Sequence, residues 1–453
     1  MPEPFFTWFF REMVMRPLNI AVSFLLASGY LLATPAAQTT PQPAVTTPEW
    51  PGWGGPRRDF TCDAAELAAS WPPDGPKQIW SRPLGEGHSS IIVDGGRLYT
   101  MYRPPTGVKN RWNAEEVVVA LDAASGSTIW EHRYPSSLET MNFSRGSGPH
   151  STPLIVGDRL FAASTDKQFF ALDKRTGKVL WSHNFVQEYQ APPNQMRWAV
   201  QPGYAPSPIA HDDNIIAMVG GPGQGVMAFR QDDGRVVWRS GEFTDIVPAS
   251  PLLVTLDGEE QLIVTSGDGA HGFDPHDGRP LWSHGFPTKS GVNITTPIWS
   301  PEDRLLFLTA AYDGGARVLQ LGRSGSRTEV TELWFSNQMR VHFGNVLRLG
   351  DYYYGSSGDF GAAFLTAVNA RTGEIAWRDR TFAKASFLNV QGKVILLDED
   401  GMLALVTLSG DGLNVLAKAQ IARAISWTVP TLVKTTLYVR DRVNIMALDV
   451  GTK

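Results

Sequence analysis

Residues 171–181 read ALDKRTGKVLW, and this stretch recurs along the chain. Each near-complete copy places a glycine four residues before a tryptophan. Self-similarity at a regular interval is typical of repeat architectures, so these copies decide the fold. The other near-complete copies are ALDAASGSTIW at 120–130, AFRQDDGRVVW at 228–238, GFDPHDGRPLW at 272–282 and AVNARTGEIAW at 367–377.

One copy has the pattern of a β-hairpin. Two short apolar runs flank a turn that contains glycine, which supplies the positive φ that tight hairpin turns need. A tryptophan at the same point of each copy predicts a large ring buried between neighbouring repeats. The marker positions are Trp80, Trp130, Trp181, Trp238, Trp282, Trp334 and Trp377, spaced by 43 to 57 residues, and the eighth position falls near Ala417.

A second hairpin precedes each copy, as HSTPLIVGDRLFAA at 150–163 does for the copy at 171–181. The two hairpins form a four-stranded unit that is repeated eight times. Four-stranded repeats of roughly 40 to 50 residues are typical of β-propellers. The sequence therefore predicts an all-β fold: an eight-bladed β-propeller of four-stranded antiparallel blades over residues 77–453.

Three copies depart from the pattern in informative ways. The copy at 318–334 has a longer turn, which predicts a longer outer hairpin. The chain carries only the end of a copy at 77–80 (KQIW) and only the beginning of one at 446–449 (MALD). These halves are complementary, so we expect the strand at 77–84 to pair with the last strand and close the ring without an exposed edge.

The N-terminal part has the pattern of an export segment. Two arginines precede an apolar run at 18–33 and small residues follow, which is typical of a secretory signal at 1–37. A membrane anchor is the alternative, although the run is short for a span. Residues 38–76 are expected to form a Pro/Thr-rich linker and a capping segment. The interpretation is a periplasmic or secreted protein whose contact with a membrane is limited to an uncleaved N-terminal segment.

Charge and cysteine content narrow the classes of function. The net charge is −5, so no basic field favours nucleic acid as a partner. The single cysteine, Cys62, has no partner for an internal disulfide and is interpreted as a free structural thiol. Secretion without a disulfide is compatible with the bacterial periplasm, where a large core does not need disulfides.

The tandem motif ALDxxTGxxxW and its partner hairpin resemble the PQQ-like (pyrroloquinoline quinone) propeller repeat over nearly all of 77–450. That group includes quinoprotein alcohol dehydrogenases and BamB-like scaffolds of the bacterial envelope, so the resemblance implies the fold and leaves the function open. The stretch WPGWGGPRRDF at 50–60 resembles the segment that precedes the propeller in many envelope members. Its tryptophans, Trp50 and Trp53, are expected to cap one face of the ring or pack on its rim.

The resemblance also states what an enzyme of this group would carry. It implies PQQ on the propeller axis with calcium held by Glu, Asn and Asp, a catalytic Asp, a Trp floor and often a disulfide of adjacent cysteines. The adjacent cysteines are absent here, and most acidic residues lie in turns such as DGG at 94–96 or DEDG at 398–401, where Asp–Gly favours turn geometry. No catalytic residue and no metal ligand is therefore assigned from the sequence.

Candidate binding residues lie just before the inner strand of each blade. Alignment of the eight blade starts gives one equivalent position occupied by His88, His150, Ala205, Pro248, Ile294, Phe343, Ala385 and Trp427. The tetrad NQMR occurs twice, at 194–197 and 337–340, which places Arg197 and Arg340 near the channel mouth. The functional interpretation is an anionic or carbonyl-bearing ligand held by both arginines, with His88, His150, Tyr204, His342 and Trp427 around it. The alternative is that both arginines bridge blades through carboxylates or backbone carbonyls.

The sequence therefore favours a binding or scaffold module of the bacterial envelope, with an envelope protein or a small anionic ligand as partner. The alternative is a PQQ-dependent alcohol or sugar dehydrogenase with the quinone and Ca²⁺ on the axis. A lectin-like or small-ligand receptor that uses the two arginines is a third hypothesis. No cofactor is assigned.

Overall fold

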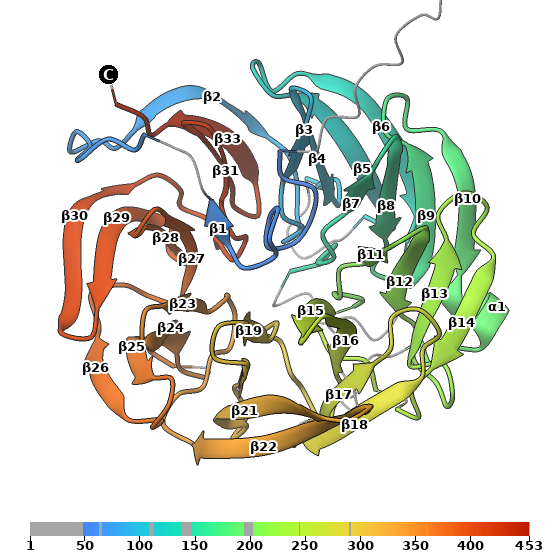
Figure 1. The fold of residues 1–453 in the computed structure, drawn as a ribbon. Helices are drawn as coiled ribbons and strands as arrows, with labels where there is room; N and C mark the ends of the chain where they lie inside the picture. Colours follow the sequence, from blue (N-terminus) through green and yellow to red (C-terminus); the bar gives the residue numbers. More distant parts are fainter. Residues whose placement is uncertain are drawn as a thin grey trace, which may run out of the picture. The chain divides into compact units, whose positions relative to one another are not determined.

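The computed structural model describes residues 49–452 except 63–65, 108–112, 137–145, 194–202, 244, 290 and 360. The described residues form eight four-stranded antiparallel blades in a ring, which confirms the predicted propeller (Figure 1). In blades 1 to 7 the four strands follow the chain from the inside of the ring outward, whereas the outermost strand of blade 8 is β2, from the start of the propeller. The one described helix, α1 (Phe185–Tyr189), begins where β10 ends.

The blades are numbered in chain order. Blade 1 contains β3 (Ile92–Asp94), β4 (Arg97–Tyr102), β5 (Glu115–Asp122) and β6 (Thr128–Pro135); blade 2, β7 (Leu154–Val156), β8 (Arg159–Ala163), β9 (Gln168–Asp173) and β10 (Val179–Asn184); blade 3, β11 (Ile209–His211), β12 (Asn214–Met218), β13 (Val226–Arg230) and β14 (Val236–Ser240); blade 4, β15 (Leu252–Leu256), β16 (Glu259–Thr265), β17 (Gly269–Phe273) and β18 (Pro280–Gly285).

Blade 5 contains β19 (Ile298–Ser300), β20 (Leu305–Ala310), β21 (Gly315–Ser324) and β22 (Arg327–Ser336); blade 6, β23 (Leu347–Leu349), β24 (Tyr352–Ser357), β25 (Phe364–Asn369) and β26 (Ile375–Asp379); blade 7, β27 (Ala385–Val390), β28 (Lys393–Asp398), β29 (Met402–Ser409) and β30 (Gly412–Gln420); blade 8, β31 (Thr431–Val433), β32 (Thr436–Arg440), β33 (Asn444–Asp449) and β2 (Lys77–Pro83). The long β21–β22 hairpin is the one that the stretched copy at 318–334 predicts.

Blade 8 joins the two ends of the propeller, as predicted. Strand β2 pairs antiparallel with β33, from Lys77 opposite Asp449 to Pro83 opposite Asn444. Figure 1 shows β2 outside β33, beside the C-terminus. The fully buried Arg440 of β32 reinforces this closure, because its guanidinium donates to the carbonyls of Gly85, Ser89 and Met101 and to the Thr100 hydroxyl. Burial lowers the pKa of Arg440 to about 10.

A β-bulge sets the direction of each marker tryptophan. In blade 1, Trp130 faces Ala120 while Thr128 faces Leu121, so Ile129 is an extra, unpaired residue. A bulge of this kind turns the following side chain away from the regular pleat. The bulged residue itself is exposed, which accounts for the exposed aliphatic side chains on the outer strands. These are Ile79, Ile129, Leu180, Val237 and Leu333.

Six of the seven marker tryptophans then dock onto the next blade. The indole of Trp130 lies over the turn of blade 2, where Nε1 donates to the carbonyl of Lys174 at 3.1 Å. A Cβ on Gly177 would lie 2.5 Å from the same ring, so this turn glycine provides both a positive φ of 74° and room for the indole. The same indole-to-carbonyl bond is made by Trp80 to Ala123, Trp181 to Gln231, Trp238 to Pro275, Trp334 to Ala370 and Trp377 to Ser409.

Hydroxyl groups at the inner strands link the blades a second time. The backbone N–H of Ser90 donates to the Thr152 hydroxyl, and that of Thr152 donates to the Ser207 hydroxyl. The Ser207 N–H donates to Ser250, whose N–H in turn donates to Thr296. Because each bond runs from one blade to the next, the serines and threonines at the blade starts are architectural.

The segment at 49–62 crosses the inner strands of several blades. Trp50, 3% exposed, forms an antiparallel bridge with Val93, and the indole of Trp53 donates to Thr296 at 3.0 Å. Strand β1 (Thr61–Cys62) pairs in parallel with β27. The segment thus lies against inner strands of blades 1, 5 and 7, and Figure 1 shows β1 inside the ring.

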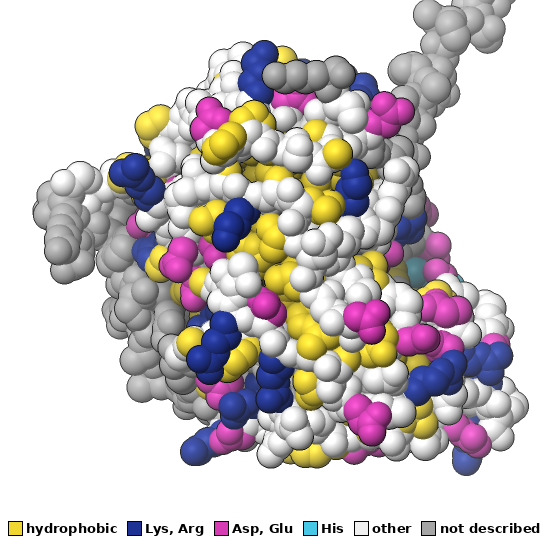
Figure 2. All heavy atoms as spheres, turned by 90° about the vertical axis from the view of Figure 1, so that its left-hand side faces the viewer, with side chains coloured by type: hydrophobic (Ala, Val, Ile, Leu, Met, Phe, Trp, Pro, Cys, Tyr) yellow, Lys and Arg dark blue, Asp and Glu magenta, His cyan; other side chains and the backbone are white. Residues whose placement is uncertain are grey.

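Charges of both signs are mixed on the outer surface. Figure 2 views the ring from the side of β30, where Lys and Arg alternate with Asp and Glu around a band of hydrophobic side chains. No single sign dominates this face, in agreement with the small net charge of −5.

Candidate functional site: an aromatic cluster on the propeller axis

The residues that precede the inner strands gather aromatic rings at one end of the axis. This end is opposite the first hairpin turns, because every inner strand runs from here toward its turn. At four of the eight aligned positions the side chain is a ring that contacts another ring of the group: His88 of blade 1, His150 of blade 2, Phe343 of blade 6 and Trp427 of blade 8. With His342 and Tyr312 they form a group that we call the axial aromatic cluster.

Successive rings in the cluster are in contact. His150 stacks on His88 with centroids 5.4 Å apart and an interplanar angle of 11°. His88 lies 5.0 Å from Trp427, and Trp427 stacks on Phe343 at 4.2 Å and 20°. Phe343 in turn stacks on His342 at 3.8 Å. Aromatic pairs at these separations attract each other beyond simple burial, so the cluster links four blades across the axis.

The contact between Phe343 and Trp427 spans blade 7. Blades 6 and 8 are separated by blade 7, where the aligned position is Ala385 at the start of β27. Ala385 is 3% exposed. The stacking of Phe343 on Trp427 thus joins two blades that are not neighbours in the ring.

Hydrogen bonds fix the orientation of His342 and of Trp427 in the cluster. Nδ1 of the buried His342 lies 2.8 Å from the carbonyl oxygen of Asp359, so Nδ1 carries the proton and donates. Nε2 of His342 then accepts from the Tyr312 hydroxyl at 2.6 Å. In the middle of the cluster, the indole Nε1 of Trp427 donates to Glu399 Oε2 at 2.9 Å.

Ion pairs flank the cluster on both sides. Arg340 lies 3.3 Å from Asp313 of blade 5 and 3.4 Å from Asp359 of blade 6. On the other side Arg442 pairs with Glu86 at 2.7 Å. A Cβ on Gly146 would lie 2.8 Å from His88 Nε2 and 3.6 Å from Arg442 Nε, so this ion pair lies close to the histidine. The two arginine side chains thus lie beside the cluster with their positive charges balanced by carboxylates.

The structure separates the sequence-based candidates. It brings His88, His150, His342 and Trp427 together and places Arg340 beside them, where this arginine bridges two blades through carboxylates, as the alternative interpretation holds. Tyr204 is 1% exposed and its hydroxyl donates to the Met218 carbonyl inside the core. Burial raises the pKa of Tyr204. Arg197 lies outside the described residues.

A buried ionic network supports the loop that carries His150. Arg103 donates to Glu116 at 2.5 Å and to the carbonyls of Ser136 and Ser147. Glu116 also accepts from the Tyr134 hydroxyl and from the backbone N–H and hydroxyl of Thr165 in blade 2. Burial raises the pKa of the Glu116 carboxyl, and the charge of Arg103 opposes that shift.

Sequence reasoning missed several members of this site. Tyr312, Glu399 and Arg442 lie in loops of blades 5, 7 and 8 that share no motif with one another, so no local pattern connects them. Arg103 and Glu116 are likewise unremarkable in the sequence. Glu116 stands beside Glu115 at the start of β5, before the apolar run, so nothing in the sequence marks it as the buried one of the two.

The described residues at this end of the axis do not fit a PQQ–calcium site. A stacked quinone needs a free aromatic face, and the indole of Trp427 is contacted by both Phe343 and His88. Calcium needs several converging oxygen ligands. Among the described residues, one group of His, Cys, Asp or Glu side chains lies close enough together to share a metal ion. It consists of His211, Glu260 and His276 and lies at hairpin turns of blades 3 and 4.

Eight blades joined by docked tryptophans and serine or threonine hydroxyls define the class of PQQ-like repeat propellers. The chain belongs to the family of outer membrane protein assembly factor BamB, whose family model matches residues 114–378, more than half of the chain.

Relatives of two kinds share this repeat. The chain is 25% identical over 257 residues to the outer membrane protein assembly factor BamB of Burkholderia pseudomallei, covering 48% of this chain and 61% of that protein. It is 31% identical over 117 residues to a quinoprotein ethanol dehydrogenase of Pseudomonas putida, covering 23% of this chain and 16% of that enzyme. The chain thus spans less than two thirds of the length of either relative.

Solved structures agree on the fold. BamB from Moraxella catarrhalis superposes with a TM-score of 0.55 at 16% identity, covering 83% of this chain and 99% of that one. The quinohemoprotein alcohol dehydrogenase of Comamonas testosteroni gives 0.58 at 13% identity, covering 90% and 81%. In the described residues no helix has the length and apolar character needed to cross a membrane.

Proposed function

We propose that this protein is a binding or scaffold propeller of the bacterial envelope and that the axial aromatic cluster takes part in recognising a protein partner. The observation that carries the proposal is that the rings on the axis contact one another, with both Phe343 and His88 on the indole of Trp427. Membership in the BamB family and the export pattern at 1–37 support the envelope as the location.

The chemistry of the cluster suits a protein surface. His88, His150, Phe343 and Trp427 are half-buried, so each ring keeps part of its surface accessible to solvent. Aromatic residues and arginine are enriched where proteins bind one another, because they bury a large area with few rotatable bonds. Arg340 and Arg442, each already paired with carboxylates, would contribute polar contacts at the rim of such an interface.

The first experiment separates a scaffold from a quinoprotein enzyme. Purified protein is equilibrated with PQQ and Ca²⁺, passed over a desalting column, and assayed for retained quinone absorbance and for dye-linked oxidation of alcohols and aldoses. We expect neither retained quinone nor dye reduction. Dye reduction that rises with the amount of retained PQQ would establish the dehydrogenase instead.

A second experiment addresses the partner surface. A photo-crosslinking amino acid is introduced at Phe343 in the source bacterium, and a matched control carries it at Glu329, an exposed residue of β22 on the outside of the ring. We expect a discrete crosslinked envelope protein from position 343 that is lost when Trp427→Ala is added. Equal crosslinking from both positions would contradict recognition at the cluster.

A further inference from the structure

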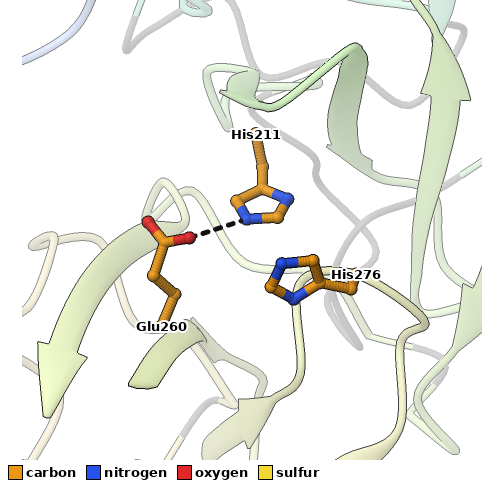
Figure 3. Close-up of side chains that lie close together, drawn as sticks. All are labelled: His211, Glu260 and His276. Carbon is orange, nitrogen blue, oxygen red and sulfur yellow. Dashed lines mark hydrogen bonds and ion pairs between the residues drawn. The ribbon is translucent and has the colours of Figure 1, made fainter. Parts of the chain in front are cut away.

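Two histidines and a glutamate meet at the seam between blades 3 and 4. His211 is the last residue of β11, Glu260 lies in β16, and His276 lies in the turn between β17 and β18. One ligand atom of each side chain lies within 4.8 Å of the other two. Figure 3 shows the three side chains pointing toward one another from three separate segments. The group lies at hairpin turns, away from the axial aromatic cluster, and has no part in the function proposed above.

The outer histidine is oriented for coordination. Nδ1 of His276 lies 3.0 Å from Asp274 Oδ1, and the same carboxylate oxygen accepts the backbone N–H of His276. A carboxylate only accepts at neutral pH, so Nδ1 of His276 carries the proton and Nε2 keeps its lone pair. A histidine whose second nitrogen donates to a carboxylate is the usual arrangement of a metal-bound imidazole.

The inner histidine has an unused buried nitrogen. The side chain of His211 is 3% exposed, and its Nε2 lies 3.1 Å from Glu260 Oε2. Its Nδ1 is buried and has no hydrogen-bond partner among the described residues. Oδ2 of the exposed Asp212 lies 3.7 Å from this nitrogen and 3.9 Å from His276 Nε2. A small rotation of Asp212 would bring it to Nδ1, so both imidazoles would then have a carboxylate behind them.

The geometry assigns this group as a binding site for Zn²⁺ or a closely similar transition-metal ion, with His211, His276 and Glu260 as ligands. Two imidazole nitrogens with one carboxylate are a ligand set that suits Zn²⁺, whereas Mg²⁺ and Ca²⁺ prefer oxygen ligands alone. Ligand atoms around a zinc ion lie about 3.3 Å apart, given bond lengths of about 2 Å. Glu260 and His276, with side chains 46% and 61% exposed, are free to close the remaining distance.

Such an ion would connect two blades. His211 comes from blade 3, while Glu260 and His276 both come from blade 4. Binding to the folded protein alone would therefore stabilise this seam against unfolding.

The test measures metal binding by the full chain with any affinity tag removed. Zn²⁺ is titrated in competition with a chromogenic chelator, and Mg²⁺ and Ca²⁺ are titrated by calorimetry. We expect one Zn²⁺ per chain with micromolar or tighter affinity, no saturable Mg²⁺ or Ca²⁺ binding, and a thermal unfolding midpoint that rises with Zn²⁺. His276→Ala and Glu260→Gln, both at exposed side chains, should each weaken the affinity at least tenfold.

His284 offers a matched control. Its Nε2 lies 2.9 Å from Glu332 Oε2, so it reproduces the histidine–glutamate pair without a second imidazole. His284→Ala should leave Zn²⁺ affinity and the zinc-dependent rise in the midpoint unchanged. Wild-type protein that binds no Zn²⁺ below 100 µM, or a His276→Ala variant that binds as tightly as wild type, would overturn the assignment.

Discussion

At the scale of single residues, the repeat depends on a tryptophan and a glycine that belong to different blades. The indole of Trp130 donates to the Lys174 carbonyl and covers Gly177, whose φ is 74°. Glycine is required at this position for two reasons: the backbone is left-handed, and a Cβ would collide with the ring above it. This explains why glycine recurs four residues before the tryptophan in each near-complete copy while the residues around it vary.

Substitutions at two glycines separate the cost of the left-handed backbone from the cost of the collision with the ring. Gly177→Ala adds a Cβ about 2.5 Å from the Trp130 ring and also strains the backbone, so we expect a loss of about 3 kcal/mol in the free energy of unfolding. Gly157→Ala, at a φ of 55° with no atom within 4 Å of the added Cβ, carries the backbone strain alone and should cost about 1 kcal/mol. Urea unfolding measures both losses. Equal losses would show that the indole of Trp130 moves aside without lowering the free energy of unfolding.

Sequence alone predicted the residues that repeat better than those that do not. The tryptophan spacing predicted the blades and the contact of the rings with neighbouring repeats, which six of the seven marker tryptophans make through their indole N–H. The alignment of blade starts placed His88, His150, Phe343 and Trp427 at one level. It could not predict that Phe343 stacks on Trp427, or that Asp313 and Asp359 pair with Arg340. Those contacts join loops far apart in the chain and have no local signature.

At the scale of elements, blade 5 shows how the fold compensates for an irregular repeat. Its β21–β22 hairpin lacks the short turn onto which a preceding tryptophan docks elsewhere. Trp282 of blade 4 instead donates to the buried Gln261 side chain of its own blade at 2.8 Å. Gln261 connects Trp282 to blade 5, because its Nε2 donates to the Thr328 hydroxyl of that blade. A side-chain amide thus replaces the missing turn carbonyl.

This substitute contact gives a prediction for the hairpin. Gln261→Met keeps the side-chain size but leaves the buried indole N–H of Trp282 without an acceptor, so we expect a loss of about 2 kcal/mol in the free energy of unfolding. Gln187→Met, at an exposed position of α1, should change it by less than about 0.5 kcal/mol. Chemical denaturation followed by tryptophan fluorescence measures both. An unchanged midpoint for Gln261→Met would mean that Trp282 finds another acceptor.

At the scale of the whole molecule, closure of the ring depends on blade 8. Strand β2 completes this blade, and Arg440 donates four hydrogen bonds to groups of blade 1 and of the chain leading into it. Its lowered pKa of about 10 reflects the cost of burying a charge, yet the guanidinium stays protonated at neutral pH. The hydrogen bonds have to outweigh that cost for the seam to hold.

Replacing the guanidinium tests the closure. In Arg440→Met the acceptors at Gly85, Ser89, Thr100 and Met101 lose this donor, so we expect a loss of about 3 kcal/mol in the free energy of unfolding. Arg82→Met, at a less buried arginine of β2 on the same seam, should cost about 1 kcal/mol or less. Calorimetric unfolding of both variants decides it; a more stable Arg440→Met protein would show that burial of the charge outweighs its hydrogen bonds.

The seams also give the ring a direction. Six tryptophans donate forward to the following blade, and the inner N–H groups of blades 1 to 4 do the same. Contacts of this head-to-tail kind end only when they close on themselves; otherwise they continue as an open filament. A chain that lost a blade would present a donating face at one end and an accepting face at the other. Assembling the last blade from both ends of the propeller therefore also prevents polymerisation.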